Sequence, residues 1–300
     1  MTKFDSIYKD IVLDIINNGQ MQKWNVRAVY ADGTPAYTKY VYGVNFKISP
    51  NDGVPILQSK QTGWKTALKE LDWIWRQMSN SVDELNDMGV RIWDEWRLKD
   101  GTIGKSYGYQ LKNKKRKVMT STVWPYRDGQ VITNDIREKE LNQVEFVLHE
   151  IYNNPRSRRI MTSLFDVDDL GDMALEPCVW NTNWSVDDDG RLNLFVRQRS
   201  GDIMLGVPFN VIQYWVLLNR IAQVTGCELG TMYWSIDNAH IYDRHLELAE
   251  EQVTADISEL ERVESKLILP ESLDFFNTPL HEAKIVNYKH NGNYKYEVAI

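Results

Sequence analysis

Apolar side chains recur along the chain with two different periods, which predict a mixture of helices and strands. From Phe4 to Asn18 they return every three or four positions, as on one face of a helix, and Gly19 follows as a stop. The same period, bounded by capping and breaking residues, predicts further helices. These cover residues 66–78, 82–88, 138–153, 211–224 and 239–252.

Alternation of apolar and other residues predicts the strands. After an irregular arm, Tyr40, Tyr42, Val44 and Phe46 alternate with their neighbours. Helices and strands are mixed without regular βαβ alternation, and no stretch resembles a linker. We therefore expect an α+β fold in a single domain spanning residues 1–300. Further strands are predicted at residues 159–165, 179–186 and 192–199, with an Asp-Asp-Asp-Gly hairpin turn at 187–190.

Composition narrows the class of protein. The chain has 300 residues, of which 43% are hydrophobic, so it can bury a large core. The net charge of -7 argues against DNA or RNA binding, because such proteins usually carry a basic face. The one basic run, at residues 112–117, is interpreted as a solvated loop.

Other counts point to the cytoplasm. Two cysteines are too few for a disulfide framework, and the first residues do not resemble a signal peptide. No apolar run is long enough for a transmembrane helix. The five histidines are scattered without the spacing of metal ligands, so we expect no metal site.

Residues with chemical potential gather between positions 176 and 210. Cys178 follows a proline, Arg199 lies one hairpin later, and Asn210 opens an apolar run. A thiolate is a nucleophile, and a nearby guanidinium lowers its pKa and can also bind phosphate. An amide can donate and accept together at a base edge. An arbitrary cysteine is more often a small buried hydrophobe, and Cys227 is assigned that role.

Further motifs, in order along the chain, resemble those of thymidylate synthases. The matches run from Arg27 to Ile300, and the likeness is greatest to the variant found in some Bacilli and their phages. The chain is therefore identified as a member of that family. The motifs are Ile-Trp-Asp-Glu-Trp at 92–96, the glycine-tyrosine segment at 104–110, Ser-Arg-Arg at 157–159, Asn-Ala-His-Ile-Tyr at 238–242 and the closing Glu-Val-Ala-Ile.

The resemblance implies a mixed, twisted sheet flanked by helices, and a homodimer that packs sheet to sheet. It also implies reductive methylation of dUMP to dTMP through an adduct between Cys178 and C6. The one-carbon and hydride donor would be 5,10-methylenetetrahydrofolate. Asn210 matches O4 and N3–H of uracil, whereas Asp stands there in relatives that use cytosine nucleotides.

The resemblance also assigns site residues. The catalytic set is Cys178, Glu70, Arg199, Asn210, Tyr107 and Trp93. The dUMP set is Arg27, Gln198, Arg199, Ser200, Asp202, Asn210, His240 and Tyr242, with Arg158 and Arg159 from the partner subunit. The folate set is Lys60, Ile92, Trp93, Trp96, Leu175, Asp202, Leu205, Gly206, Phe209 and Ala299.

Two alternatives stay open at this point. Water instead of hydride could capture the exocyclic methylene and give hydroxymethyl-dUMP, although Trp93 and the closing tail favour a synthase by excluding water. A catalytically weak member that binds nucleotide or its own RNA is the other alternative. Departures from the common family pattern keep the first one open: Val179, Gly201, Asp237-Asn238 and Lys105-Ser106.

Overall fold

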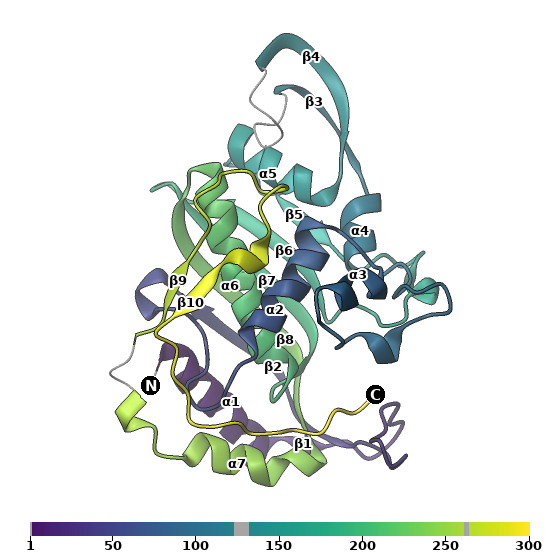
Figure 1. Ribbon diagram of the computed structural model, residues 1–300, viewed down its shortest axis with the longest axis vertical. Coiled ribbons are helices and arrows are strands. Elements are labelled where there is room, and N and C mark those ends of the chain that lie inside the picture. The colour runs from purple at the N-terminus through teal and green to yellow at the C-terminus, as the bar shows by residue number, and fades with distance from the viewer. Residues whose placement is uncertain (1, 123–131, 261–263) are drawn as a thin grey trace.

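A six-stranded mixed sheet organises the computed structural model, which describes residues 2–122, 132–260 and 264–300 (Figure 1). The strand order is β1-β2-β8-β7-β6-β5; only the β7–β8 pair is parallel. The strands are β1 (Gln20–Met21), β2 (Thr38–Ile48), β5 (Met161–Ser163), β6 (Val179–Val186), β7 (Arg191–Asp202) and β8 (Glu228–Tyr242).

Helices and two small hairpins surround this sheet. Figure 1 shows one hairpin, made of β3 and β4, projecting from one end of the molecule. The hairpin strands are β3 (Arg116–Thr122), β4 (Ile132–Leu141), β9 (Lys266–Ile268) and β10 (Lys284–Val286). The α-helices are α1 (Lys3–Asn18), α2 (Trp64–Leu71), α3 (Val82–Asp87), α4 (Gly108–Asn113), α5 (Gln143–Asn153), α6 (Gly206–Thr225) and α7 (Leu246–Thr254). Shorter helical turns lie at Pro50–Asp52, Asp72–Arg76, Asp94–Trp96, Leu170–Asp172, Asp243–His245, Ser258–Leu260 and Leu280–Glu282.

Helix α6 is the centre of the core. It connects the parallel strands β7 and β8 and is buried along most of its length, which explains its nearly unbroken apolar sequence. Leu192, Leu194 and Val196 alternate along β7 as its buried side chains. Burying each such side chain stabilises the fold by roughly 1.5–3 kcal/mol. The site described below is built where β7 ends and α6 begins.

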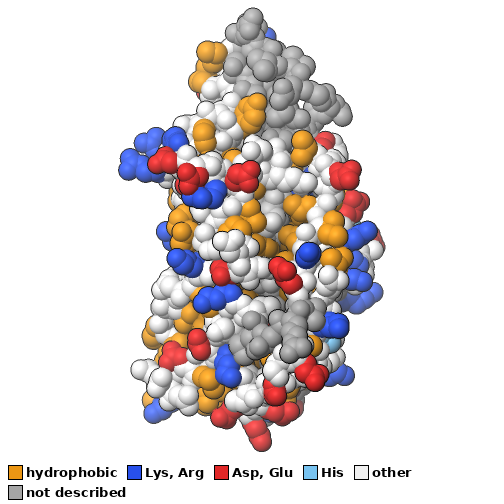
Figure 2. Space-filling view, turned by 90° about the vertical axis from the view of Figure 1, so that its left-hand side faces the viewer, with side chains coloured by type: hydrophobic (Ala, Val, Ile, Leu, Met, Phe, Trp, Pro, Cys, Tyr) orange, Lys and Arg blue, Asp and Glu red, His pale blue; other side chains and the backbone are white. Residues whose placement is uncertain are grey.

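The opposite face of the sheet is partly exposed. Phe195 on β7 and Tyr233 on β8 stack there with ring centroids 4.6 Å apart. On the face of the molecule shown in Figure 2, acidic and basic side chains are interspersed around hydrophobic ones. Within the described parts of the chain, no helix combines the length and the apolar character needed to cross a bilayer.

Several predicted elements are confirmed. Helix α1, strand β2, strand β6 and the 187–190 turn lie where the periodicity placed them. The predicted helix over 66–78 begins as α2 but widens at Asp72–Arg76 into a π-helical turn.

Two predicted helices were placed too early. Residues 138–141 are the end of β4, and α5 begins only at Gln143, where Asn142 and Glu145 cap each other reciprocally. Residues 239–242 are likewise not helical, since they end β8 and pair with β2. Helix α7 starts at Leu246. In both cases strand pairing, with β3 for residues 138–141 and with β2 for residues 239–242, overrides the local apolar period.

The basic run at 112–117 was also misread as a loop. Its first residues end α4 and its last ones begin β3. Its charges are paired: Lys114 lies 2.7 Å from a carboxylate oxygen of Asp169, and Lys117 lies 2.9 Å from one of Glu138. The run is therefore a set of surface ion pairs.

Candidate active site

The backbone of Cys178 is held from two directions. Its N–H donates to the hydroxyl of Tyr107 at 3.1 Å, and its carbonyl accepts from the N–H of Arg199 at 2.9 Å. The preceding segment is fixed as well, because the Ser106 hydroxyl donates to the carbonyl of Leu175 at 2.7 Å. The thiol at the head of β6 is thus placed on a rigid junction.

Tyr107 reaches Cys178 from a strained backbone. Its φ is +43°, a backbone conformation that residues other than glycine rarely adopt. Gly108 follows because a Cβ there would lie 2.0 Å from the carbonyl oxygen of Ser79. The glycine-tyrosine motif therefore packs the start of α4 tightly and carries the hydroxyl to Cys178.

Arg199 joins the thiol to the neighbouring strand. Its guanidinium donates to the carbonyls of Pro177, at 3.1 Å, and Glu176, at 2.8 Å, and the side chain is 34% exposed. The guanidinium has five N–H donors, so these bonds leave others for an anion. Arg199 both fixes the loop before Cys178 and provides positive charge at an accessible edge.

The electrostatics of the thiol are balanced between burial and charge. Burial raises the pKa of Cys178, while the charges of Arg199 and Arg27 and the Tyr107 hydrogen bond lower it. Burial dominates, so the pKa is raised overall. We expected Arg199 to depress the pKa; its charge and that of Arg27 do oppose the shift, but burial outweighs them.

Asp202, His240 and Tyr242 lie on the same side of the sheet. One Asp202 oxygen accepts from the N–H groups of Met204 and Leu205, at 2.9 and 3.2 Å, and so shapes the turn into α6. Burial raises the pKa of Tyr242 to about 12, and the charges of Asp202 and Cys178 add to this shift. Asp202 pairs with His240 across β7 and β8, and Tyr242 follows two positions later on β8.

His240 has its tautomer set by a neighbour. Its Nδ1 lies 3.0 Å from the side-chain oxygen of Asn238, which accepts only, so Nδ1 carries the hydrogen. Burial lowers the pKa of His240, although the charge of Asp202 opposes the shift. The neutral ring therefore keeps Nε2 as an acceptor.

Glu70, near the end of α2, is a buried carboxyl with two strong donors. Only 8% of the residue is exposed, and it accepts from Trp93 Nε1 and Gln213 Nε2, both at 2.6 Å. Burial raises its pKa above the ordinary value, although the two hydrogen bonds oppose the shift. Trp93 packs edge-on against Tyr107 with ring centroids 5.3 Å apart, which links this carboxyl to the Cys178 junction.

Asn210 lies in the second turn of α6 with its amide held at both ends. Its Oδ1 accepts from Gln198 Nε2 and its Nδ2 donates to Gln213 Oε1, each at 3.2 Å. Gly206, one turn earlier, would place a Cβ 4.0 Å from Asn210 Oδ1. Ser200 contributes its carbonyl, which accepts from Gln198 at 3.0 Å.

The residues predicted to contact the folate lie in several separate places. Leu205 and Phe209 flank the start of α6, and Trp96 packs edge-on against Trp93 at 5.5 Å. Ile92 is exposed, and Ala299 is half-buried in the closing tail. Lys60 points inward: it is 6% exposed, donates to the carbonyl of Met204, and burial lowers its pKa to about 8.

The C-terminal tail, which ends at Ile300, is joined to the irregular arm between β1 and β2 that carries Arg27. Val29 and Ile300 exchange two backbone hydrogen bonds, at 2.8 and 3.0 Å. Arg244 donates to Asp32 in the arm at 2.7 Å and to Glu297 in the tail at 3.0 Å. The segment with the phosphate-binding candidate Arg27 and the tail expected to bind folate are therefore connected to each other.

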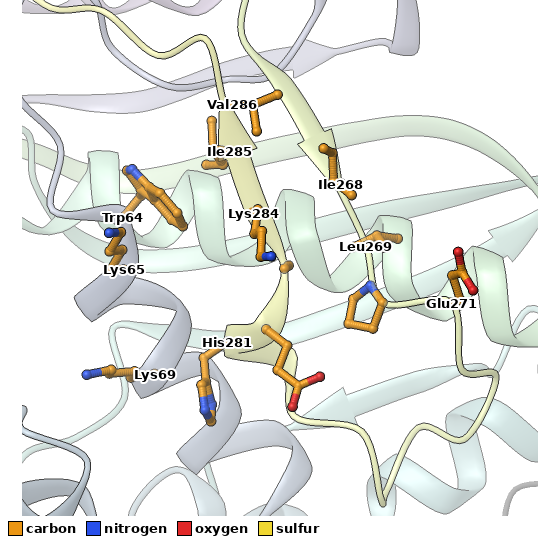
Figure 3. Close-up of a pocket in the computed structure, with 13 residues that line it drawn as sticks. Trp64, Lys65, Lys69, Ile268, Leu269, Glu271, His281, Lys284, Ile285 and Val286 are labelled. Carbon is orange, nitrogen blue, oxygen red and sulfur yellow. The ribbon is translucent and has the colours of Figure 1, made fainter.

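A cavity of about 740 Å³ lies elsewhere, between α2 and the β9–β10 hairpin (Figure 3). Its lining combines the apolar side chains of Trp64 and Ile285 with the amines of Lys65 and Lys284. It holds no thiol, and neither Glu70 nor Asn210 lines it. Across residues 2–122, 132–260 and 264–300, no three His, Cys, Asp or Glu side chains gather where they would hold a metal ion.

Comparison with known proteins explains this arrangement. A model of the family described as thymidylate synthase matches residues 6–300. The chain belongs to the thymidylate synthase family. It is 44% identical to the thymidylate synthase of Bacillus phage phi3T and 43% identical to thymidylate synthase 1 of Bacillus subtilis strain 168, each over all of both chains. The structure of thermostable thymidylate synthase A from Bacillus subtilis aligns with a TM-score of 0.85 and 43% identity, covering 99% of each chain.

The residues expected around Cys178 come together within one chain, but the double arginine does not join them. Arg158 and Arg159 follow α5 and are exposed. The basic side chains that lower the pKa of Cys178 are Arg199 and Arg27. The double arginine is thus directed to solvent rather than to this chain's own site.

Most departures from the common thymidylate synthase pattern have a local structural reason, and nothing in the structure explains Asp237. Gly201 leaves room for neighbours, since a Cβ there would lie 2.9 Å from Val207 and 3.0 Å from Ile236. Val179 is part of the buried core. Asn238 orients His240, Lys105 pairs with Asp169 at 3.0 Å, and Ser106 anchors the Cys178 segment.

Sequence reasoning missed two residues that organise this thymidylate synthase site. Gln213 contacts both Glu70 and Asn210, and its signal was an amide in an apolar helix, three positions after Asn210. Arg244 joins arm and tail, but its partners lie more than fifty residues away on both sides, so local patterns could not show it.

Proposed function

We propose that this thymidylate synthase converts dUMP to dTMP through a covalent bond between Cys178 Sγ and C6 of the uracil. The co-substrate 5,10-methylenetetrahydrofolate would supply the one-carbon unit and the hydride. The carrying observation is the junction at Cys178, where Tyr107 and Arg199 fix the backbone and two arginines favour the thiolate. A thiolate suits this chemistry because it adds readily and leaves again.

Other residues would each bind a different part of the nucleotide: its phosphate, its 3′-hydroxyl or its base. Arg27, Arg199 and Ser200 would bind the phosphate, as guanidinium forks suit its oxygens. The acceptor Nε2 of His240 and the hydroxyl of Tyr242 would hold the 3′-hydroxyl. As Sγ adds to C6, negative charge moves onto C5 and O4, and the Asn210 amide would stabilise it there.

Product analysis tests this function. Purified protein is incubated with dUMP and 5,10-methylenetetrahydrofolate, and the nucleotide is identified by mass while dihydrofolate absorbance is followed. We expect dTMP and dihydrofolate in equal amounts, because Trp93 is 6% exposed and the tail is bonded to the arm, which together exclude water. Hydroxymethyl-dUMP without dihydrofolate would replace this function with the hydroxymethylase reaction.

Glu70 is proposed to relay protons between solvent, base and folate. Replacing it by glutamine should lower kcat by roughly 10²–10⁴-fold, the usual range for a lost general acid-base group. Because burial raises the pKa of Glu70, the acid limb of the wild-type rate profile should lie above the ordinary carboxyl value of about 4.3. Rates measured from pH 5 to 9 check both points. A variant that keeps the wild-type acid limb would show that another group titrates there.

We further propose a homodimer in which Arg158 and Arg159 complete the partner's phosphate site. Two observations support this: both side chains are exposed, and the outer face of the sheet presents the stacked pair Phe195 and Tyr233. An apolar patch shared through a two-fold axis would be buried twice.

Mixed subunits test the shared site. Chains carrying Cys178→Ser are refolded together with chains carrying Arg158→Ala and Arg159→Ala. Each mixed dimer would regain one intact site, so random pairing should restore about a quarter of wild-type activity from two inactive parents. No recovery despite mixed dimers on native mass spectrometry would place both arginines outside the partner's site.

The organisation and location of the protein are proposals as well. One hydrophobic cluster runs from Phe4 to Tyr296, which supports a single catalytic domain over the chain. Cys178 and Cys227 are free thiols. A catalytic thiol needs reducing surroundings, so we place the enzyme in the cytoplasm.

A further inference from the structure

A line of hydrogen bonds runs behind the base-reading amide and has one direction throughout. Trp234 Nε1 donates to Gln198 Oε1 at 3.0 Å, and Gln198 Nε2 donates to Asn210 Oδ1. Asn210 Nδ2 donates to Gln213 Oε1, and Gln213 Nε2 donates to Glu70. The line starts at an indole that can only donate and ends at a carboxylate that can only accept.

Gln213 is locked in this line. It is 3% exposed, and both hydrogens of its amide are used, one by the carbonyl of Ala67 at 2.9 Å and one by Glu70 at 2.6 Å. Turning the amide over would set its oxygen against both of these oxygens. The only orientation without repulsion leaves Oε1 facing Asn210.

The locked glutamine in turn fixes Asn210. Turning over the Asn210 amide would oppose its oxygen to Gln213 Oε1 and its nitrogen to Gln198 Nε2. An asparagine that could turn freely would fit cytosine as well as uracil, because the two bases present opposite patterns at N3 and at the exocyclic group. Orientation of this amide is therefore what separates the two bases.

We propose that Gln213 is the positioning residue that holds Asn210 in the orientation for uracil and ties that orientation to the carboxylate of Glu70. This inference rests on the proposed function, since it assumes a pyrimidine nucleotide at Asn210. It adds a source of base selectivity that does not touch the base. Buried amides left without partners are costly, so the discrimination is expected to be steep.

The first test removes the hydrogen bonds of Gln213 to both Asn210 and Glu70. Gln213→Met keeps the length of the side chain and loses its hydrogen bonds. Dissociation constants of dUMP and dCMP are measured by calorimetry with the wild-type enzyme and the variant. We expect the preference for dUMP over dCMP to fall at least about tenfold, with dUMP weakened and dCMP strengthened. Equal weakening of both nucleotides would overturn the inference.

A second variant separates the two contacts of Gln213. Gln213→Glu keeps an acceptor for Asn210 but places a carboxyl beside Glu70, where two like charges cannot both ionise freely. The preference for dUMP should stay within about threefold of wild type, because Asn210 keeps its acceptor. The acid limb of the rate profile should move to higher pH. Loss of base preference in this variant, or an unmoved acid limb, would contradict the proposed coupling.

A matched control distinguishes positioning from stability. Gln143, at the start of α5, is another buried glutamine, and its side chain donates to the carbonyls of Gln110 and Ser163. It lies away from the residues proposed to bind the nucleotide. Gln143→Met should lower the melting temperature and leave the ratio of dUMP to dCMP affinity unchanged. If the wild-type enzyme binds no dUMP, the proposed function fails together with this inference. If it binds dUMP and Gln213→Met keeps the wild-type preference, only this inference fails.

Discussion

Replacing Cys178 by serine is expected to reduce turnover by roughly 10⁴-fold or more, in the range seen when a covalent nucleophile is removed. A serine hydroxyl at neutral pH is a far weaker nucleophile than a thiolate, which the charges of Arg199 and Arg27 favour. The backbone bonds to Tyr107 and Arg199 do not involve the sulfur, so the junction itself should persist. Binding of dUMP should therefore change only a few-fold.

Single-turnover rates and mass spectrometry of trapped complexes check this expectation. The wild-type enzyme should show a protein–nucleotide adduct, and the serine variant should show none while still binding dUMP by calorimetry. Cys227→Ser is the matched control, because that thiol follows α6 with Thr225 as its hydrogen-bond neighbour. Turnover retained by Cys178→Ser would remove the thiol from the mechanism.

Asn210→Asp should reverse the choice of base. The ratio of kcat/KM for dCMP to kcat/KM for dUMP should rise by on the order of 10³-fold over the wild-type ratio, so that dCMP becomes the preferred substrate. A carboxylate has no N–H to offer O4 of uracil, whereas it accepts from the exocyclic amine of cytosine. Gln198 Nε2 would still donate to it. Gln213 Oε1 would instead face a carboxyl oxygen, which favours the protonated form of the acid.

Competition assays with both nucleotides measure this change directly. Asn219→Asp offers the same substitution on the same helix, where the side chain only donates to the carbonyl of Trp215 at 2.8 Å. That control should keep the wild-type preference. If Asn210→Asp also prefers dUMP, a different group reads the base edge.

Local sequence predicted the elements whose period and boundaries agree, such as α1 with its glycine stop and β6 with its hairpin turn. It failed where a strand and a helix adjoin almost without a loop. The β4–α5 junction has only Asn142 between the two elements, so one apolar period appeared to run through both. Distant pairing with β2 decided the fate of residues 239–242.

The site shows the same division. Ordered motifs predicted Cys178, Glu70, Asn210 and their neighbours, because their spacing along the chain carries the information. The balance between burial and charge at the thiol could not be predicted, since it depends on how deeply a three-dimensional junction is covered. The inward direction of Lys60 is a packing outcome of the same kind.

The joint between arm and tail has a thermodynamic consequence for how the two substrates bind. Arg244 and the Val29–Ile300 bonds connect the segment proposed to bind the nucleotide with the tail proposed to bind the folate. Free energy is a state function, so any factor by which bound nucleotide tightens the folate must equal the factor by which bound folate tightens the nucleotide. Weakening Arg244 should therefore reduce both factors equally, whichever substrate arrives first.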